Sequence, residues 1–391
     1  MYENLETNFP RELMEFADQK WPSTASLFPR NFLVQAYLHK YSDGIDIHYG
    51  REVSGLYGLG NYAICGGKRW KVIARNKNER RRWERDFDAV VVATGTFDKR
   101  FEPDYSGLDE WKTRYPNSVL HSKSYRNPRR FRGKKVLIIG NSASGRDISL
   151  QLVSVASQVW VSSTRPNGRS HASIGAVGPI SRFDPDNHSI ETEDGFRLRN
   201  IDKVILCTGY QYSIPFLKRR LRGKEPVWSD TFYIDSLFEH MFWIHGPSLS
   251  FVGLPKQGPT FLISQAQGAI IARYLAGRLP LPSMMEMALW EEWDEFEWEK
   301  RRRRPSDENA KTYHNLPYPK CKEYIDRLEL WFNRKDKKNR RGGSRPFVWT
   351  DRIDWIMRNR ARIRDAFEKQ GLYKHSFATP ESLGITRSKL E

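Results

Sequence analysis

The segment at residues 136–147 constrains the fold of this chain more than any other, because it reads VLIIGNSASGRD. It contains an apolar strand, a turn with the spacing G-x-S-x-x-G, and the start of a helix. Backbone N–H groups at a helix N-terminus bind a phosphate when no bulky side chain blocks the approach. The turn therefore predicts a dinucleotide site, the alternative being a simple tight turn between a strand and a helix. The predicted cofactor-binding residues are Gly140, Asn141, Ser142, Ala143, Ser144 and Gly145.

The segments around this turn alternate between strand and helix. Apolar runs at 134–140, 158–164 and 203–207 indicate strands, and 145–157 indicates a helix. A strand, a crossover helix and a further parallel strand form a doubly wound α/β unit. We therefore expect a parallel sheet in this part of the chain.

Arg165 follows the second of these strands, at the point where an NAD-binding unit places an acidic residue on the ribose hydroxyls. An arginine can instead pair with the 2′-phosphate of NADP. The position predicts that NADPH is preferred over NADH, with an ordinary surface arginine as the alternative.

Hydrophobic periodicity predicts the remaining elements. The expected helices are 27–42 opened by Pro29, 261–277, 283–300 with a capping box of Ser283 and Glu286, and a late helix marked by Ile353, Ile356, Met357, Ile363 and Phe367. The expected strands are 63–75, 85–92 and 251–255, and the turn-rich stretch 98–133 is expected to be a linker.

Composition narrows the class of protein. The three cysteines, Cys65, Cys207 and Cys321, have no C-x-x-C spacing, which argues against a disulfide framework and against a zinc site. No run of about 18 apolar residues occurs, so we expect no membrane span and a cytoplasmic protein. The chain has a net charge of +18, and its densest basic clusters, which lie between apolar segments, are 80–85, 126–135, 300–304 and 334–345. We expect these clusters to be solvated surface, the alternatives being a targeting signal or a nucleic-acid patch.

Several further motifs occur in a fixed order, and together they resemble the flavin-containing monooxygenase family over roughly residues 1–282. The segment 121–126, HSKSYR, resembles the H-x-x-x-[FY] end of that family's fingerprint, although Tyr115 and Asn117 replace its phenylalanine and glycine. Residues 2–10 resemble its Y-x-x-L-x-T-N-x-P segment. The remaining matches are Ala93-Thr94-Gly95, Thr208-Gly209-Tyr210, and Gly253-Leu254-Pro255 with Gln265 and Gln267.

This resemblance implies an enzyme that uses FAD and NADPH. NADPH would reduce the flavin, oxygen would add to it as a hydroperoxide, and a soft nitrogen or sulfur of a small molecule would take one oxygen atom. Asn8 would be the catalytic residue, by polarising groups at the flavin. The resemblance implies that Thr94, Gly95, Thr208, Gly209 and Gln265 bind cofactor, and it requires no metal.

The fold implied by the resemblance is α/β, with two dinucleotide-binding (Rossmann-like) domains and a helical C-terminal extension. The expected boundaries are 1–128 for the first part of an FAD domain, 129–212 for an NADPH domain, 213–282 for the returning FAD segment and 283–391 for the helical region.

The family holds FAD with a G-x-G-x-x-G unit ahead of the Y-x-x-L segment, which here begins at residue 2, so we expect the FAD domain to be incomplete at its N-terminus. A literal match to such a loop at 58–63 has no leading strand, and we interpret it as chance. The alternative function is a non-catalytic remnant that binds NADP(H) or a partner but does not retain FAD.

Overall fold

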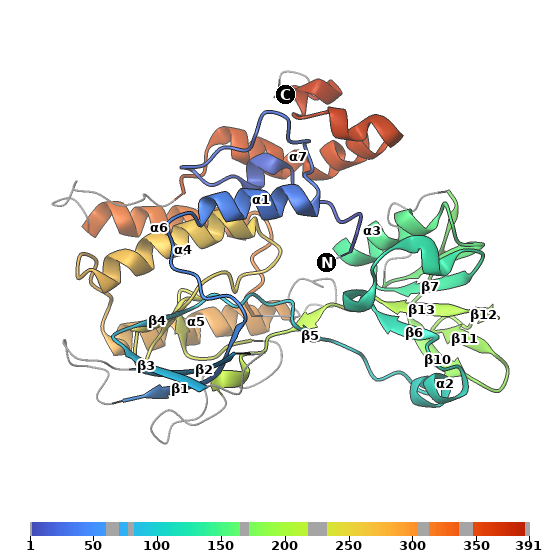
Figure 1. Cartoon of the computed structure of the whole chain (residues 1–391), viewed down its shortest axis with the longest axis horizontal. Helices are drawn as coiled ribbons and strands as arrows, with labels where there is room; N and C mark the ends of the chain where they lie inside the picture. The colour runs from blue at the N-terminus through green and yellow to red at the C-terminus, as the bar shows by residue number, and fades with distance from the viewer. Residues whose placement is uncertain are drawn as a thin grey trace. The chain divides into compact units, whose positions relative to one another are not determined.

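The chain divides into two compact units, which the computed structural model describes over residues 2–59, 70–76, 82–164, 172–217, 233–302, 313–335 and 347–387 (Figure 1). Unit 1 consists of Met1–Asn8, Arg30–Phe32 and Phe97–Gln211. Unit 2 consists of Phe9–Pro29, Leu33–Thr96 and Tyr212–Glu391. Each unit has buried clusters of its own, so each is described separately.

A five-stranded parallel sheet forms the centre of unit 1. Its order is β6-β13-β7-β8-β9, and every neighbouring pair is parallel. The strands are β6 (Val119–His121), β7 (Lys135–Ile139), β8 (Gln158–Ser162), β9 (Ile174–Val177) and β13 (Lys203–Leu206). Helix α3 (Ala143–Leu152) connects β7 to β8, so the predicted doubly wound unit is confirmed.

Both faces of this sheet are covered, which explains why its strands are continuously apolar. Val136 and Ile138 pack with Ile148 of α3 on one face. Leu137 and Ile139 pack on the other face, in a cluster with Leu108, Trp111 and Phe183. Successive side chains of a strand point to opposite faces, so a strand buried on both sides has no polar alternation.

The stretch 98–133 is not a linker, and that prediction was wrong. It contains β5 (Lys99–Arg100), α2 (Leu108–Arg114), β6, and the 3-10 turns η2 (Ser122–Ser124) and η3 (Pro128–Phe131). Leu108 and Trp111 of α2 are buried one helical turn apart. Two apolar residues in the seven-residue helix α2 and two in the edge strand β6 are too few to produce a visible period among so many charges and turn residues.

The other described strands of unit 1 pair in antiparallel fashion. The strands β10 (Ile180–Asp184), β11 (Ser189–Thr192) and β12 (Arg197–Arg199) form one sheet, and β14 (Tyr210–Gln211) pairs with β5. The N-terminal segment joins this unit, because the Glu3 N–H donates to the Arg126 carbonyl at 2.9 Å and the Tyr2 hydroxyl donates to Asp147.

The described part of unit 2 contains two small sheets. An antiparallel sheet is formed by β1 (Arg51–Gly58), β2 (Trp70–Asn76) and β3 (Arg82–Phe87). A second has the order β15-β16-β17-β4, from β15 (Leu237–Phe238), β16 (Phe242–Trp243), β17 (Leu249–Phe251) and β4 (Val90–Val92). The predicted single strand 85–92 was wrong, because β3 pairs with β2 while β4 pairs with β17 in the other sheet. Residues 63–69 of the predicted strand 63–75 lie outside the described residues.

The predicted helices are confirmed. Besides α2 and α3, the described helices are α1 (Asn31–Tyr41), α4 (Thr260–Leu275), α5 (Met284–Arg302), α6 (Lys320–Lys335) and α7 (Asp351–Glu368). Further 3-10 turns lie at Arg11–Met14, Pro215–Leu217, Gly371–Ser376 and Glu381–Leu383. At the start of α5 the Ser283 N–H donates to Glu286 at 2.7 Å, and the Glu286 N–H donates to the Ser283 hydroxyl at 3.3 Å. This is the predicted capping box.

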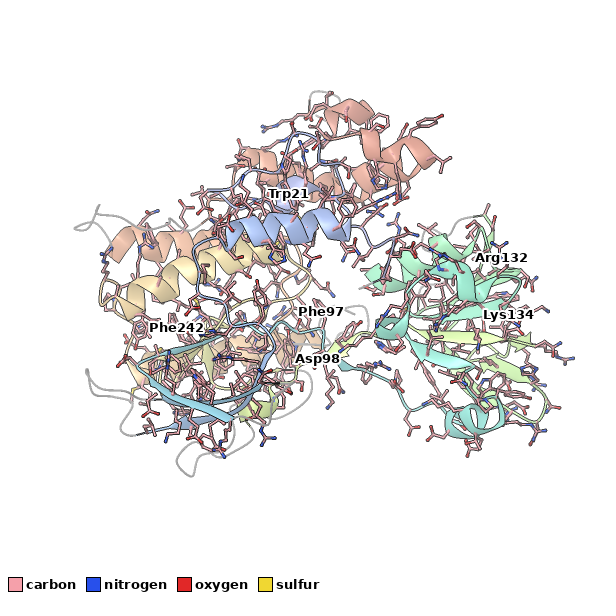
Figure 2. The ribbon with its side chains drawn as sticks, in the orientation of Figure 1. Trp21, Phe97, Asp98, Arg132, Lys134 and Phe242 are labelled. Atoms are coloured by element: carbon pink, nitrogen blue, oxygen red, sulfur yellow. The ribbon has the colours of Figure 1, made fainter. Side chains whose placement is uncertain are left out.

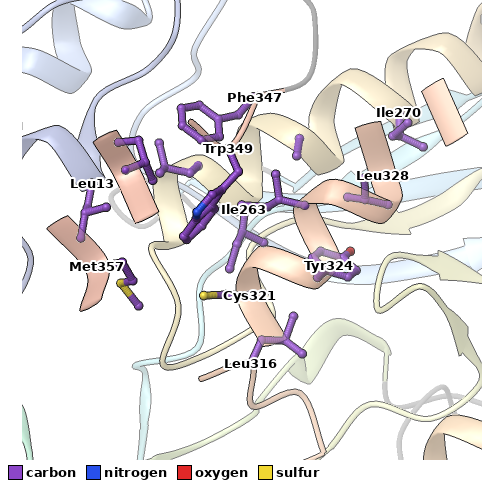
Figure 3. Close-up of a cluster of buried hydrophobic side chains, with 14 of the residues drawn as sticks. Leu13, Ile263, Ile270, Leu316, Cys321, Tyr324, Leu328, Phe347, Trp349 and Met357 are labelled. Atoms are coloured by element: carbon purple, nitrogen blue, oxygen red, sulfur yellow. The ribbon is translucent and has the colours of Figure 1, made fainter. Parts of the chain in front are cut away.

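The largest buried cluster of unit 2 lies among the late helices (Figure 3). Ile263 and Ile270 of α4 pack there with Leu328 of α6 and Met357 of α7. The α/β class with a helical C-terminal region is therefore confirmed. In the described ranges, every helix is either too short or too polar to span a lipid bilayer.

A chain of buried polar groups in unit 2 fixes two histidine tautomers. The Ile234 N–H donates to His314 Nε2 at 3.0 Å, so the His314 proton is on Nδ1 and points to His240 Nδ1 at 3.1 Å. The His240 proton is then on Nε2, which lies 3.8 Å from an Asp294 carboxylate oxygen. Burial lowers the pKa of both imidazoles, that of His240 to about 3.

We predict that the stabilising effect of neutral His240 depends on pH. The unfolded chain binds this proton below about pH 6.5, whereas the folded chain resists it until about pH 3, so the contribution is complete above pH 6.5 and is lost as pH falls. His240→Gln should therefore destabilise most near neutral pH, and its cost should shrink by up to about 1.4 kcal/mol per pH unit below 6.5.

Urea unfolding of both proteins across this range measures the difference. His39→Gln is the matched control, because His39 is exposed on α1 and its replacement removes an imidazole without touching the buried pair. A cost of His240→Gln that is constant with pH would contradict the assignment.

Candidate functional site

The turn between β7 and α3 requires glycine at Gly140. Its φ is +104°, and a Cβ there would lie 2.5 Å from the Cys207 carbonyl oxygen. The Gly140 N–H donates to the Ser162 carbonyl at 2.9 Å, which ties the turn to the end of β8. A side chain at Gly140 would thus clash with the chain leaving β13.

Gly145 permits the close approach of α3 to this turn. A Cβ at Gly145 would lie 1.9 Å from the Gly140 carbonyl oxygen and 3.5 Å from the Cys207 side chain. The backbone of the helix therefore touches the backbone of the turn. This is the role expected for the last glycine of a dinucleotide-binding turn.

Three amides at the start of α3 have no acceptor among the described residues. The first helical bond is from the Arg146 N–H to the Ser142 carbonyl, at 2.9 Å. In the described part of the chain, the N–H groups of Ala143, Ser144 and Gly145 have no acceptor, and the Ser142 side chain does not cap the helix. Asn141, Ser142 and Ala143 are exposed. Unpaired donors at the positive end of a helix dipole form an anion site.

Thr208 and Gly209 lie at the same edge of the sheet. They follow β13, the neighbour of β7, and the Cys207 N–H between them and the strand donates to the Ile139 carbonyl at 2.8 Å. The Thr208 hydroxyl donates to the Phe101 carbonyl, and the Gly209 carbonyl accepts from the Phe101 N–H at 3.0 Å. The structure therefore brings these two residues near the 140–145 turn.

His121 holds the end of β6 in this arrangement. The Lys123 N–H donates to its Nδ1 at 3.1 Å, so the proton is on Nε2, which donates to the Gly209 carbonyl at 3.0 Å. Burial lowers the pKa of His121, which keeps the ring neutral. Both ring nitrogens are engaged inside unit 1, so His121 positions Gly209.

Of the other predicted site residues, three are exposed and one lies outside the described residues. Asn8 is exposed at the end of the N-terminal segment of unit 1. Thr94 and Gly95 are exposed in unit 2, directly after β4, and Gly95 has a φ of +72°. Arg165 lies outside the described residues.

Gln265 uses its side chain to hold another segment of unit 2. It lies on α4 and is mostly buried, its oxygen accepts from the Ala17 N–H at 3.0 Å, and its nitrogen donates to Asp18 at 3.4 Å. Gln267 is likewise engaged, accepting from the Gly253 N–H at 2.9 Å and donating to the Tyr324 hydroxyl at 2.9 Å. Both glutamines therefore position backbone segments.

Sequence reasoning missed Lys256, which follows the Gly253–Pro255 segment. Its ammonium lies 3.9 Å from the centre of the Tyr212 ring, and burial lowers its pKa to about 8. A lysine after a proline carries no signal in the sequence. The described residues bring together no group of three or more histidine, cysteine, aspartate or glutamate side chains suited to hold a metal ion.

The described basic clusters lie on the surface, as expected from their position between apolar segments. Arg132 and Lys134 are exposed on unit 1 next to the start of β7 (Figure 2). Much of the expected clusters at 300–304 and 334–345 falls outside the described residues.

Comparison with known proteins gives consistent matches. The family model described as flavin-binding monooxygenase-like matches residues 1–170 and 180–335. The thiol-specific monooxygenase of Saccharomyces cerevisiae is 31% identical over 370 residues, which cover 90% of this chain and 78% of that protein. A flavin-containing monooxygenase of Arabidopsis thaliana, FMO GS-OX-like 9, is 33% identical over 304 residues, which cover 73% of this chain and 64% of that protein.

Among solved structures, the S-allyl-L-cysteine S-oxygenase from Allium sativum matches with a TM-score of 0.77 at 26% identity. The match covers 98% of this chain and 82% of that one.

We predict that Gly145→Ala weakens dinucleotide binding at the turn. The added methyl group would meet the Gly140 carbonyl at 1.9 Å, so α3 must shift and the three amides lose their common direction. Calorimetric titration with NADP⁺ should show an affinity at least about ten-fold lower, which corresponds to about 1.4 kcal/mol.

Gly268→Ala is the matched control for this experiment. Gly268 lies inside α4 with no atom within 4 Å of an added Cβ, so alanine should stabilise the fold by about 0.5–1 kcal/mol and leave binding unchanged. A folded Gly145→Ala protein that binds NADP⁺ as tightly as the wild type would refute this role of the turn.

Proposed function

The chain belongs to the flavin-binding monooxygenase-like family, and we propose that it is an NADPH- and FAD-dependent monooxygenase that oxygenates a soft sulfur or nitrogen centre of a small molecule. The observation that carries the proposal is the Gly140–Gly145 turn, whose unpartnered amides follow a parallel strand. Membership of this family implies a flavin cofactor. The turn is the proposed binding place of the dinucleotide that would reduce the flavin.

The turn fits a pyrophosphate in charge and in shape. The amides of Ala143, Ser144 and Gly145 would donate to phosphate oxygens at the positive end of α3. Ser142 replaces the glycine that is usual in the middle of such turns, and its side chain is small and exposed. It therefore leaves the approach to the amides open.

We propose that Arg165 binds the 2′-phosphate that distinguishes NADPH from NADH. The proposal rests on its place after β8, where the ribose end of a bound dinucleotide is expected. A guanidinium can form two parallel hydrogen bonds with a phosphate, which gives both affinity and selectivity.

The flavin-side roles of the motif residues are part of the same proposal. Thr94 and Gly95 would approach the flavin with exposed backbone after β4, and Asn8 would present an exposed amide that can both donate and accept. Thr208 and Gly209 would contribute backbone beside the turn. Gln265 would act indirectly, because its amide already holds Ala17 and Asp18.

A bound flavin would supply two-electron transfer from NADPH and the activation of dioxygen, one oxygen atom of which would go to the substrate and the other to water. The residues of this chain then have the task of orienting the two cofactors and keeping water from the reacting centre. His121 contributes by fixing Gly209, and its lowered pKa makes it a neutral organiser.

The names of two relatives favour sulfur over nitrogen. One is a thiol-specific monooxygenase, and the solved structure with a TM-score of 0.77 is an S-oxygenase. We therefore propose a small thiol or thioether as the substrate class, with soft amines as the less favoured class. A thioether sulfur is a soft nucleophile at any pH, whereas an amine must first lose its proton.

We predict that the full chain, purified and supplied with FAD, is yellow and consumes NADPH and oxygen faster when a small thiol or thioether is added. NADH should be the poorer reductant, because it lacks the phosphate that Arg165 is proposed to bind. Flavin absorbance, oxygen uptake and oxidised product measured together test this.

Protein that FAD neither colours nor stabilises against heat, but that NADP⁺ does stabilise, would support the non-catalytic alternative. Protein that both cofactors stabilise and that oxidises only amines would contradict the proposed sulfur substrate alone.

A further inference from the structure

Helix α5 carries a row of large apolar side chains on its outer face. Met285, Leu289, Trp293 and Phe296 are 74%, 58%, 61% and 64% exposed. Their spacing of four, four and three residues places them on one face of a helix that turns about 100° per residue. We call these four residues the α5 stripe.

The α5 stripe is not needed to hold the helix on unit 2. The opposite face of α5 does this, because Met287 and Trp298 are buried and Trp290 packs against the main cluster. A surface helix needs one apolar face, whereas α5 has two. In the described part of the chain, no buried cluster includes any of the four stripe residues.

Carboxylates border the α5 stripe on both sides. At helical spacing, Glu286 and Glu297 fall along one edge and Glu292 and Glu299 along the other. Residues 284–302 contain seven acidic and three basic residues, although the chain as a whole has a net charge of +18. The stripe is therefore an apolar ridge within an acidic surface on a basic protein.

We propose that the α5 stripe docks an amphipathic helix of a partner protein, whose apolar ridge is bordered by lysine or arginine. Apolar anchors at helical spacing would pack along the stripe, and the basic borders would face the carboxylates. Large exposed aromatic side chains are frequent anchors at such interfaces. This proposal goes beyond the proposed oxygenation and does not depend on it.

The charges argue against two other occupants. An anionic lipid surface attracts basic helices and would be repelled by Glu292 and Glu299. A second copy packed through α5 would bring the same acidic borders together, and like charges in contact are destabilising. A basic helix is the occupant that the borders favour.

The first test uses the wild-type chain and three labelled helical peptides of about 18 residues, long enough to form a helix. One has a leucine stripe bordered by lysines, the second has glutamates in place of the lysines, and the third has the composition of the first with its leucines scrambled. Fluorescence anisotropy should show the lysine-bordered stripe binding at least about ten-fold more tightly than either other peptide. Binding of the glutamate-bordered or the scrambled peptide as tightly as the lysine-bordered one would overturn the proposal.

The second test places the binding on α5. Leu289→Gln with Trp293→Gln should weaken the lysine-bordered peptide at least about ten-fold, and Glu292→Lys with Glu299→Lys should transfer preference to the glutamate-bordered peptide. The matched control is Leu372→Gln with Tyr373→Gln, two residues that are 97% and 77% exposed elsewhere on unit 2 and whose loss should change nothing.

Two outcomes would assign the stripe to another occupant and overturn the proposal. One is wild-type binding to phosphatidylserine vesicles that the Leu289→Gln, Trp293→Gln variant loses. The other is self-association in sedimentation that the same variant loses.

Discussion

The absence of a side chain at Gly145 is the constraint on which the rest of unit 1 depends. Because Gly145 meets the Gly140 carbonyl directly, α3 can start immediately after β7 and bury Ile148 and Leu152 against the sheet. The same contact leaves the first amides of the helix at the carboxyl end of the parallel strands, which is where such sheets bind ligands. The packing of α3 and the proposed binding site thus have one physical cause in this unit.

The structure was most predictable where burial is continuous and least predictable where elements are short. Strands β7, β8 and β13 are apolar because both faces are covered, so their runs are visible without any alternation. Helix α2 and strand β6 are stabilised by partners far away in the chain, such as Phe183 and Val204. Their local sequence therefore does not reveal them. The division of 85–92 into two strands was hidden for the same reason, since pairing decides it.

The candidate site shows the same limit. The glycines of the 140–145 turn could be assigned from their spacing, because the physical requirement is local. The role of Gln265 could not, because its partners Ala17 and Asp18 lie about 250 residues away and leave no pattern beside it. Nor does any motif reveal that Lys256 lies over the Tyr212 ring. Motifs identify the positions at which the backbone must carry no bulky side chain. Long-range contacts determine which side chains already have hydrogen-bond partners.

Within unit 2, ion pairs as well as apolar packing connect the C-terminal helices to earlier segments of the chain. Arg352 of α7 donates to Glu12 at 2.9 Å, and Arg327 of α6 donates to buried Glu239 at 2.7 Å.

The proposed dinucleotide site depends most directly on the amides of Ala143, Ser144 and Gly145. Amide NMR shifts of the full chain during titration with NADP⁺ test this site, and we expect these three resonances to shift furthest. Saturable binding that leaves them unmoved would contradict it.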